Sequence, residues 1–234
     1  MEPLIKIQQL SFSYPDGKNA LTDINLSVYP GEKIGIVGAN GAGKSTLLMH
    51  INGIFTGEGS VIIDGMECDR KHLEKIRARV GVVFQNPDDQ LFSITVYDDV
   101  AYGPRYQGLP KEEIHSRVEK ALAAVQMEGY ADRNPYHLSG GEKKRIAIAT
   151  VLSMNPDILV FDEPTAGLDP RARRELLELL GRLPQTLLIA THDLELVDQL
   201  TTRMIVMNAG KIVADGPGKE LLQDQQLLFN NGLI

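Results

Sequence analysis

The stretch KIGIVGANGAGKST, residues 33–46, decides the fold. Its first five residues form an apolar run, which is typical of a strand covered on both faces in a parallel sheet. The next nine residues, GANGAGKST, match the spacing G-x-x-x-x-G-K-[ST], and the apolar stretch LLMHI that follows is typical of a helix. A strand, a glycine-rich loop and a helix in this order predict a phosphate-binding loop.

The residue types in this phosphate loop, residues 38–46, suit the binding of a nucleotide. Gly41 and Gly43 allow the backbone to curl so that successive N–H groups point inward, and the following helix adds the positive end of its dipole. Lys44 supplies a full charge, and Ser45 offers a hydroxyl to Mg²⁺. The alternative is a glycine-rich turn, but this spacing arises by chance in only about 1% of chains of this length.

A second apolar run ends in two carboxylates. In DILVFDEP, residues 157–164, the run leads directly into Asp162 and Glu163. A carboxylate at the end of a buried strand costs free energy unless a positive group meets it, so we expect Asp162 to face a metal ion. Glu163 points to the other side and is placed to polarise an attacking water as a general base. The alternative is an acidic cap for a helix that begins near residue 170, and Asp169 fits that position better.

Two kinds of strand pattern divide the chain. Alternating apolar and polar residues, separated by turn-forming PDGK and GEGS, predict short strands at residues 4–14, 23–29 and 60–65. Compact apolar runs predict strands of a parallel sheet at residues 33–37, 80–84, 157–161 and 186–190. We expect an α/β fold with a mostly parallel sheet and an N-terminal antiparallel β subdomain.

Helical periodicity fills the intervals between these runs. In residues 112–127 and 171–183, apolar residues recur at spacings of three to four, and residues 203–215 predict a hairpin. We expect a single domain over residues 1–234, with a nucleotide-binding core (1–85 and 156–234) and an inserted helical subdomain (about 86–155).

The composition excludes several classes of protein. A formal net charge of -7 over 234 residues gives no overall basic surface that would follow a phosphate backbone, so we expect no nucleic-acid partner. The single cysteine, Cys68, cannot form an internal disulfide. No apolar run approaches the roughly 18–20 residues needed to cross a bilayer, and the N-terminus lacks a signal-peptide pattern. Any link to a membrane is therefore expected to run through another subunit.

A third motif separates this chain from most proteins with a phosphate loop. LSGGEKKRIAIATVL, residues 138–152, places Ser139, Gly140 and Gly141 before a helix, which makes a second phosphate-ready loop. One nucleotide does not need two such loops on one chain. At ordinary residue frequencies, LSGGE occurs in fewer than about one chain per thousand of this length.

The phosphate loop, LSGGE and DILVFDEP, in this order, resemble the nucleotide-binding subunit of ABC transporters, from Tyr14 to about Gly216. The resemblance implies a P-loop NTPase that binds Mg²⁺ and ATP and hydrolyses ATP. It also implies a head-to-tail dimer, either a homodimer or a heterodimer with a related ATPase. Each ATP would lie between the phosphate loop of one chain and Ser139, Gly140, Gly141 and Glu142 of the other. The implied ATP-binding residues of the loop are Gly38, Ala39, Asn40, Gly41, Ala42, Gly43, Lys44, Ser45 and Thr46.

The same resemblance implies roles for single residues. Tyr14 would stack on the adenine, with a packed strand residue as the alternative. Gln85 would join the shell of Mg²⁺ and water, with a strand-end amide as the alternative, and Asp169 would belong to a loop that crosses the dimer interface. His192 would contact the terminal phosphate and act with Glu163, although a lone histidine is more often a satisfied core or surface residue. The implied Mg²⁺ ligands are Ser45, Gln85 and Asp162.

A narrower resemblance begins around Gln85. The run FQNPDDQLFSITVYDDVAYGP, residues 84–104, resembles the ATPases of cobalt- and nickel-type importers and of energy-coupling-factor vitamin importers, although Ile94 stands where that family often has proline. The resemblance implies a transmembrane coupling subunit bound in a groove near Gln85–Phe92, and a peripheral place on the cytoplasmic face of the cell membrane. As an alternative for this run, a short helix would be capped by Asp88, Asp89 and Gln90.

The same motifs help to distinguish this chain from other classes of nucleotide-binding protein. An ATPase of another ABC transporter class would share most of them, so this alternative stays open. A soluble ABC ATPase that acts on nucleic acid usually carries long coiled coils, zinc modules or a second cassette, and none is present in the sequence. A GTPase should show an NKxD-like motif, and a small-molecule kinase does not need LSGGE. The cargo stays open between cobalt, nickel, a vitamin and a queuosine-like precursor, because other subunits choose it.

Overall fold

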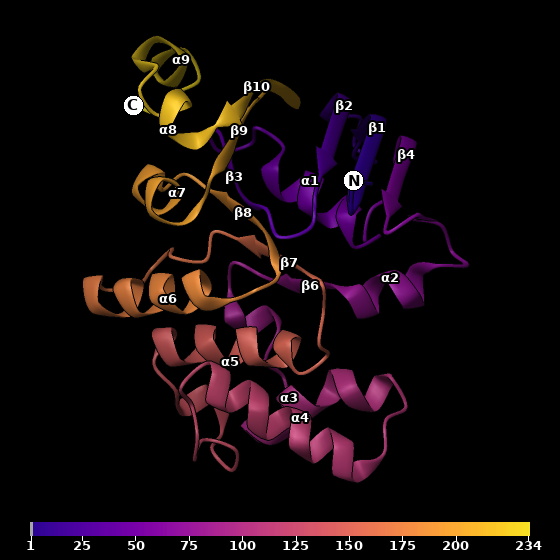
Figure 1. The fold of residues 1–234 in the computed structure, drawn as a ribbon, viewed down its shortest axis with the longest axis vertical. Coiled ribbons are helices and arrows are strands. Elements are labelled where there is room, and N and C mark those ends of the chain that lie inside the picture. The colour runs from indigo at the N-terminus through magenta and orange to yellow at the C-terminus, as the bar shows by residue number, and fades with distance from the viewer. Residues whose placement is uncertain (1) are drawn as a thin grey trace.

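Two β-sheets form the upper part of the molecule in Figure 1, and three helices form its lower end. The computed structural model describes residues 2–234. All pairs of the first sheet are antiparallel, as the alternating pattern predicted. Its strand order is β2 (Asn19–Val28), β1 (Ile5–Ser13), β4 (Glu58–Ile63) and β5 (Met66–Glu67).

The second sheet has six strands, and its pairs are parallel except for the hairpin of β9 and β10. Its strand order is β10 (Lys211–Pro217), β9 (Arg203–Asn208), β3 (Lys33–Val37), β8 (Thr186–Thr191), β7 (Ile158–Asp162) and β6 (Val80–Val83). Every residue of β6, β7 and β8 is buried. The predicted mostly parallel sheet is therefore confirmed.

Alternate residues of the central strands enter two different hydrophobic cores. Ile158 and Val160 of β7 belong to the core shared with α1 (Lys44–Ile51) and the antiparallel sheet. Leu159 and Phe161 belong to the core shared with α6 (Pro170–Arg182) and the helices at the lower end. Because successive side chains of a strand point to opposite faces, a strand covered on both faces must be apolar throughout.

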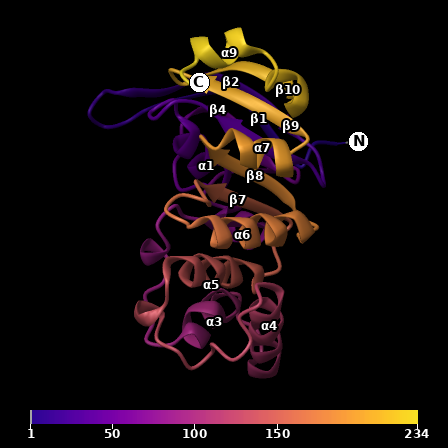
Figure 2. The same cartoon turned by 90° about the vertical axis from the view of Figure 1, so that its left-hand side faces the viewer.

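Three helices form the helical lobe, and they lie between β6 and β7 in the chain. They are α3 (Val96–Tyr106), α4 (Lys111–Ala124) and α5 (Gly140–Leu152). Figure 2 shows these helices stacked below α6. Ile114, Val118 and Leu122 of α4 are buried, which is the apolar face that the spacing predicted. The division into a core and an inserted subdomain near residues 86 and 155 stays a prediction.

The short elements were the least predictable. Neither β5 nor α2 (Leu73–Arg79) was expected, and α2 buries only Ile76, so it carries no apolar periodicity. The predicted start of the second strand was wrong, because β2 begins at Asn19 and the left-handed Asp23 (φ 50) interrupts its alternation. The strand predicted from residue 60 begins at Glu58. The remaining elements are α7 (Leu194–Leu200), α8 (Gly218–Leu221), α9 (Gln225–Asn230) and the 3₁₀ turns η1 (Pro87–Asp89) and η2 (Pro135–His137).

The contact between β6 and α5 offers a test of this packing. A Cβ atom on Gly81 would overlap the side chain of Val151. We expect Gly81→Ala to lower the free energy of unfolding by about 1–3 kcal/mol, because overpacking forces side chains out of their rotamers. The control is Gly181→Ala in α6, where the nearest atom to the new Cβ lies 3.9 Å away and alanine improves the helix. Urea unfolding measures both variants, and a Gly81→Ala variant as stable as the wild type would contradict the packing.

Candidate functional site

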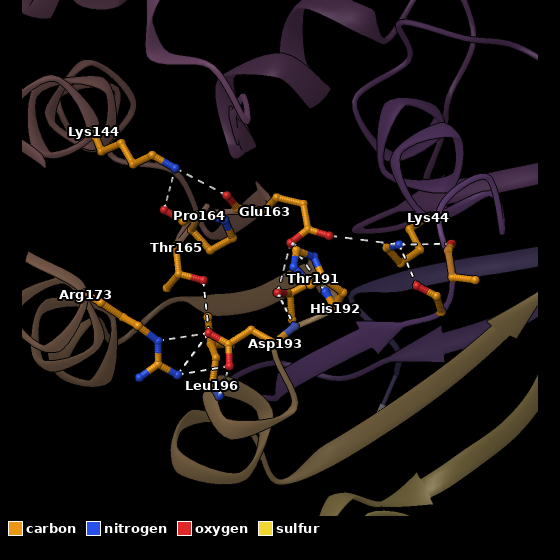
Figure 3. Close-up of polar contacts among 12 residues, drawn as sticks. Lys44, Lys144, Glu163, Pro164, Thr165, Arg173, Thr191, His192, Asp193 and Leu196 are labelled. Carbon is orange, nitrogen blue, oxygen red and sulfur yellow. Dashed lines mark hydrogen bonds and ion pairs between the residues drawn. The ribbon is translucent and has the colours of Figure 1, made fainter. Parts of the chain in front are cut away.

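Three strands end at the same edge of the six-stranded sheet. The phosphate loop follows β3, Glu163 follows β7 and His192 follows β8. Because β3, β8 and β7 are neighbours and run parallel, their carboxyl ends meet at this edge. Figure 3 shows Lys44, Glu163 and His192 near one another, each from a different segment.

The phosphate loop makes a tight turn between β3 and α1. Gly41 and Gly43 have φ angles of 80 and 103, in the left-handed region that favours glycine. A Cβ atom on Gly43 would come within 2.7 Å of the carbonyl oxygen of Ala20, so the loop also packs too closely for a side chain. Nζ of Lys44 donates a hydrogen bond of 2.8 Å to the carbonyl oxygen of Gly38 and thus lies back across the loop.

Glu163 holds its carboxylate among donors from the neighbouring segments. Its φ angle is 45, and its N–H donates to the carbonyl oxygen of Ala190 at 2.8 Å, so the chain turns sharply just after β7. Oε1 lies 4.0 Å from Nζ of Lys44. Oε2 accepts from the hydroxyl of Thr191 at 3.1 Å and lies 3.0 Å from Nδ1 of His192. The residue is only 7% exposed, so this carboxylate depends on these partners rather than on water.

Asp162, at the end of β7, has a buried carboxylate oxygen with no partner. Its Oδ1 accepts no hydrogen bond within the described chain, and the residue is 8% exposed. Burial raises the pKa of Asp162, while the hydroxyl of Ser45 and, more weakly, the charge of Lys44 act to lower it. A bare carboxylate oxygen beside a hydroxyl fits a hard divalent cation. Residues 2–234 hold no cluster of three or more His, Cys, Asp or Glu side chains that could hold a metal ion.

These groups surround a cavity of about 390 Å³. Small-molecule sites typically measure about 300–1,000 Å³. The predicted site residues that line it are Tyr14, Asn40, Gly41, Gly43, Lys44, Ser45, Thr46, Gln85, Glu163 and His192. The other predicted core residues, Gly38, Ala39, Ala42 and Asp162, belong to the same segments but are not among its lining residues. Lys18, Asn19 and Ala20 line the cavity without having been predicted, because PDGK, which ends at Lys18, was interpreted only as a turn.

Tyr14 lies at this cavity as part of an aromatic cluster. Its hydroxyl shares a hydrogen bond of 2.8 Å with the hydroxyl of Thr46 in α1. Its ring meets Phe12 and Phe55 edge to face, at centroid distances of 5.2 and 5.9 Å. Tyr14 is therefore packed against neighbouring aromatic rings, in line with the alternative of a packed strand residue. It also lines the cavity, which stacking on adenine would require.

The segment from Gln85 to Phe92, which we name the docking segment, runs from the cavity to the helical lobe. Gln90 fastens it to α5, because Nε2 donates to the carbonyl oxygen of Ala147 and to the hydroxyl of Thr150, each at 2.8 Å. The expected short helix is present as η1, with Gln90 at its C-cap, but its N-terminal cap is the side chain of Asn86, and Asp88 and Asp89 lie within the turn.

The second phosphate-ready loop begins α5 and is not among the residues that line this cavity. Ser139 caps the helix, and Glu142 accepts hydrogen bonds of 2.8 Å from its backbone N–H and from its hydroxyl. Gly140 is exposed, while Gly141 faces α6, where an added Cβ would come within 3.2 Å of Ala172. The loop is therefore placed on the helical lobe, apart from the phosphate loop of its own chain.

Asp169 lies at the start of α6, away from the cavity lining. Its side chain accepts from the N–H groups of Arg171 at 2.9 Å and Ala172 at 3.0 Å. This is the helix cap that the sequence predicted. Nothing in a single chain tests its expected place at a dimer interface.

Sequence reasoning missed three residues that hold the edge of the site. Thr191 bonds the carboxylate of Glu163, and Asp193 pairs with Arg173 through two hydrogen bonds of 3.0 Å. The signal for Thr191 was available, because it is the first polar residue after the apolar run of β8. Arg173 carried no such signal, since it is one of several arginines on α6.

A phosphate loop after the buried strand β3, with two carboxylates at the end of β7 on the far side of β8, defines a P-loop NTPase. Comparisons with known proteins narrow this class. Residues 21–166, more than half of the chain, match the model of the ABC transporter family. The energy-coupling factor transporter ATP-binding protein EcfA of Methanothermobacter thermautotrophicus is 49% identical over 231 residues, covering 96% of this chain and 74% of its own. EcfA of Methanococcus maripaludis is 49% identical over 236 residues, covering 98% and 85%.

Solved structures give the same result. The chain superposes on cbiO1 from Clostridium perfringens, described as part of the ABC transporter complex cbiONQ, with a TM-score of 0.87 and 40% identity, covering 100% of this chain and 96% of that one. It also superposes on a dimeric ATP-binding cassette in a post-hydrolysis state, bound to ADP and Pi, with a TM-score of 0.82 and 30% identity, covering 91% and 98%. The chain belongs to the ABC transporter family of ATP-binding proteins, and it is an ATP hydrolase. Across residues 2–234, no helix has the length and apolar character needed to cross a membrane.

The capping box of α5 predicts a pH-dependent contribution to stability. The Ser139 backbone N–H, followed by the hydroxyls of Tyr130 and Ser139, holds the pKa of Glu142 below its ordinary value of 4.5. The contribution is therefore present above the unfolded pKa and is lost as pH falls through the lower folded pKa. We expect Glu142→Gln to have a lower Tm than the wild type at neutral pH, and the difference to shrink on acidification. Thermal unfolding followed across pH measures it, and a constant difference would contradict this account.

Proposed function

We propose that the chain powers an importer of the energy-coupling-factor or cobalt/nickel type, by ATP hydrolysis at the cavity between the phosphate loop and Glu163. The observation that carries the catalytic part is the carboxylate of Glu163. It is buried, lies 4.0 Å from Nζ of Lys44 and opens onto the same cavity as the phosphate loop. These observations support a role for Glu163 as a base beside the position that a terminal phosphate would take.

The phosphate loop would bind ATP through its backbone N–H groups and Lys44. The loop precedes the N-terminus of α1, so the helix dipole adds to the charge of the lysine. Tyr14 would stack on the adenine from the rim of the cavity, supported by its bond to Thr46. Ser45, Gln85 and Asp162 would hold Mg²⁺, which neutralises charge on the phosphate oxygens when bound.

Glu163 would act as the general base for an attacking water. Thr191 and His192 approach one carboxylate oxygen, which leaves the other directed at Lys44 and the cavity. His192, whose side chain is 67% exposed, would contact the terminal phosphate from the same position. Because the groups are held by short contacts to neighbouring strands, most of the rate enhancement is expected from positioning and charge stabilisation.

Two chains would close head to tail around two ATP molecules. In support, Ser139 and Gly140 are exposed and are not among the residues lining the cavity of their own chain, so they are free to complete the site of a partner. Asp169 would then approach the interface from the start of α6. The partner would be a second copy or a related ATPase, and the solved post-hydrolysis cassette is itself dimeric.

The docking segment would meet a transmembrane coupling subunit at the cytoplasmic face of the membrane. Exposed apolar side chains lie at its end and just beyond it in the chain: Phe92 is 61% exposed, Ile94 80% and Tyr102 of α3 55%. The rings of Phe92 and Tyr102 meet edge to face at 5.1 Å, so they form one surface. The cargo would be a cobalt or nickel ion or a vitamin, as the resemblance of residues 84–104 implies. The helical lobe, about residues 86–155, would move relative to the core during the cycle.

Glu163→Gln separates binding from hydrolysis. The amide keeps the shape of the side chain but cannot accept the proton of the water, so we expect kcat to fall by about 10²–10⁴-fold while ATP still binds. With ATP the variant should accumulate as a dimer on size-exclusion chromatography. Steady-state phosphate release gives kcat, and a monomeric, fully active variant would refute the assignment.

As a control, Lys44→Ala should lose at least about tenfold in ATP affinity by calorimetry, because it removes a full charge from the loop.

Phe92→Asp tests the docking surface. A buried, unpaired carboxylate in an apolar contact is unfavourable, so we expect this variant to recover much less of the membrane subunits on affinity purification from detergent-solubilised cells. The matched control is Phe229→Asp, which alters an equally exposed phenylalanine (68%) on α9. Equal recovery of membrane subunits by the two variants would remove the docking segment from the proposal. Recovery of nucleic acid instead would favour the soluble class of ABC ATPase.

A further inference from the structure

Lys144 connects the helical lobe to the segment that carries Glu163. It lies in the second turn of α5, five positions after Ser139, and only 8% of it is exposed. Its Nζ donates to the carbonyl oxygen of Pro164 at 2.8 Å and to that of Glu163 at 3.3 Å. Figure 3 shows Lys144 reaching these two carbonyl groups on the side of Glu163 opposite to Lys44.

A buried ammonium is costly unless its donors are satisfied, so these two bonds matter to the local structure. Burial lowers the pKa of Lys144 to about 8, and the charge of Glu163 acts in the opposite direction. The side chain is therefore mainly charged at neutral pH, where its bonds to carbonyl oxygens are strongest. If the lysine were absent, the carbonyl oxygen of Pro164 would lose its donor, and the carbonyl oxygen of Glu163 would keep only the N–H of Ala166.

The two carbonyl groups belong to the turn that directs the carboxylate of Glu163. The left-handed φ of Glu163 is unusual for a residue with a side chain, and it persists only where the surroundings fix it. One fixed point is the bond from its N–H to Ala190, on the strand side. Another is the hydroxyl of Thr165, which bonds Asp193 at 3.2 Å. Lys144 supplies the fixed point on the helical side, where it bonds the carbonyl of Pro164 and shares the carbonyl of Glu163 with the N–H of Ala166, which donates to it at 3.2 Å.

We infer that Lys144 is a positioning residue for ATP hydrolysis, which holds the backbone of Glu163 so that its carboxylate faces the phosphate loop. This inference rests on the proposed role of Glu163 as the base. It has a consequence for the dimer, because α5 also begins with Ser139, the residue proposed to meet the nucleotide of the partner chain. A shift of α5 at that contact would be passed by Lys144 to the carboxylate that acts on the nucleotide of its own chain.

The test compares Lys144→Met with the wild type in full-length protein. Methionine fills a similar volume but offers no donor to the two carbonyl groups. We expect kcat to fall by about 10- to 100-fold, as small misplacements of a catalytic group do, with KM for ATP within about twofold of the wild type. Lys144→Arg, which keeps charge and donors, should recover kcat to within about threefold of the wild type. Lys120→Met, an exposed lysine of α4 in the same lobe, is the control and should leave both constants unchanged.

A double-mutant cycle with Glu163→Gln decides whether Lys144 acts through Glu163. If it does, adding Lys144→Met to Glu163→Gln should change the residual single-turnover rate by less than about threefold, because the group to be positioned is already gone. Losses that multiply would overturn the inference, since they would show a separate effect. So would wild-type turnover in a folded Lys144→Met, or a loss of ATP affinity that explains the lower rate.

Circular dichroism establishes that each variant is folded. If Lys144→Met does not fold, Lys144→Gln carries the test, because its amide is about one bond too short to reach both carbonyl groups. A folded Lys144→Gln with wild-type kcat would overturn the inference, and a loss of kcat with unchanged KM would support it. The proposed function fails separately: full turnover of Glu163→Gln would refute the base, whereas an inactive Glu163→Gln beside an active Lys144→Met would refute only the positioning.

Discussion

Three parallel strands, β3, β8 and β7, end side by side, and this shared edge is the constraint on which the rest of the structure depends. Each strand is buried on both faces, so polar groups can gather only where the strands stop. The phosphate loop, Glu163 and His192 occupy these ends. They therefore lie close together although they are far apart in the sequence. The hairpin of β9 and β10 also contacts this edge. The N–H of Gly210, between the two strands, donates to the carbonyl oxygen of Ala42 in the phosphate loop at 3.0 Å.

Charge at this edge is balanced by two lysines that act on different parts of Glu163. Lys44 lies 4.0 Å from its carboxylate, and Lys144 bonds its backbone carbonyl from the other side. Both lysines are buried, at 6% and 8% exposure, which makes their interactions with Glu163 stronger than they would be in water. Asp162 next to it keeps one buried carboxylate oxygen that has no hydrogen-bond partner among residues 2–234.

Three successive basic residues of α5 attach the helical lobe to three different elements. Lys143 pairs with Asp88 of η1 at 2.7 Å, Lys144 bonds the turn after β7, and Arg145 pairs with Glu175 of α6. Neighbouring residues of a helix point about 100° apart, so a run of three basic residues can reach three directions. The helix that begins with Ser139 is thus connected at once to η1, to the turn that carries Glu163 and to α6.

The sequence by itself determined the parallel sheet, the phosphate loop and the pair of carboxylates after β7, because each depends on a local pattern. Continuous apolar runs follow from burial on both faces, and glycines at fixed spacing follow from a backbone with positive φ. It did not determine α2, where a single buried residue gives no helical periodicity, or the start of β2, where the left-handed Asp23 interrupts the alternation of apolar and polar residues. Only the tertiary structure decided that Lys144 meets Glu163, that Arg173 meets Asp193, and that the loop at Ser139 is not part of the cavity of its own chain. The partners in these contacts lie about 20 or more positions apart in the sequence. Their geometry is set by how helices pack on the sheet rather than by any local sequence pattern.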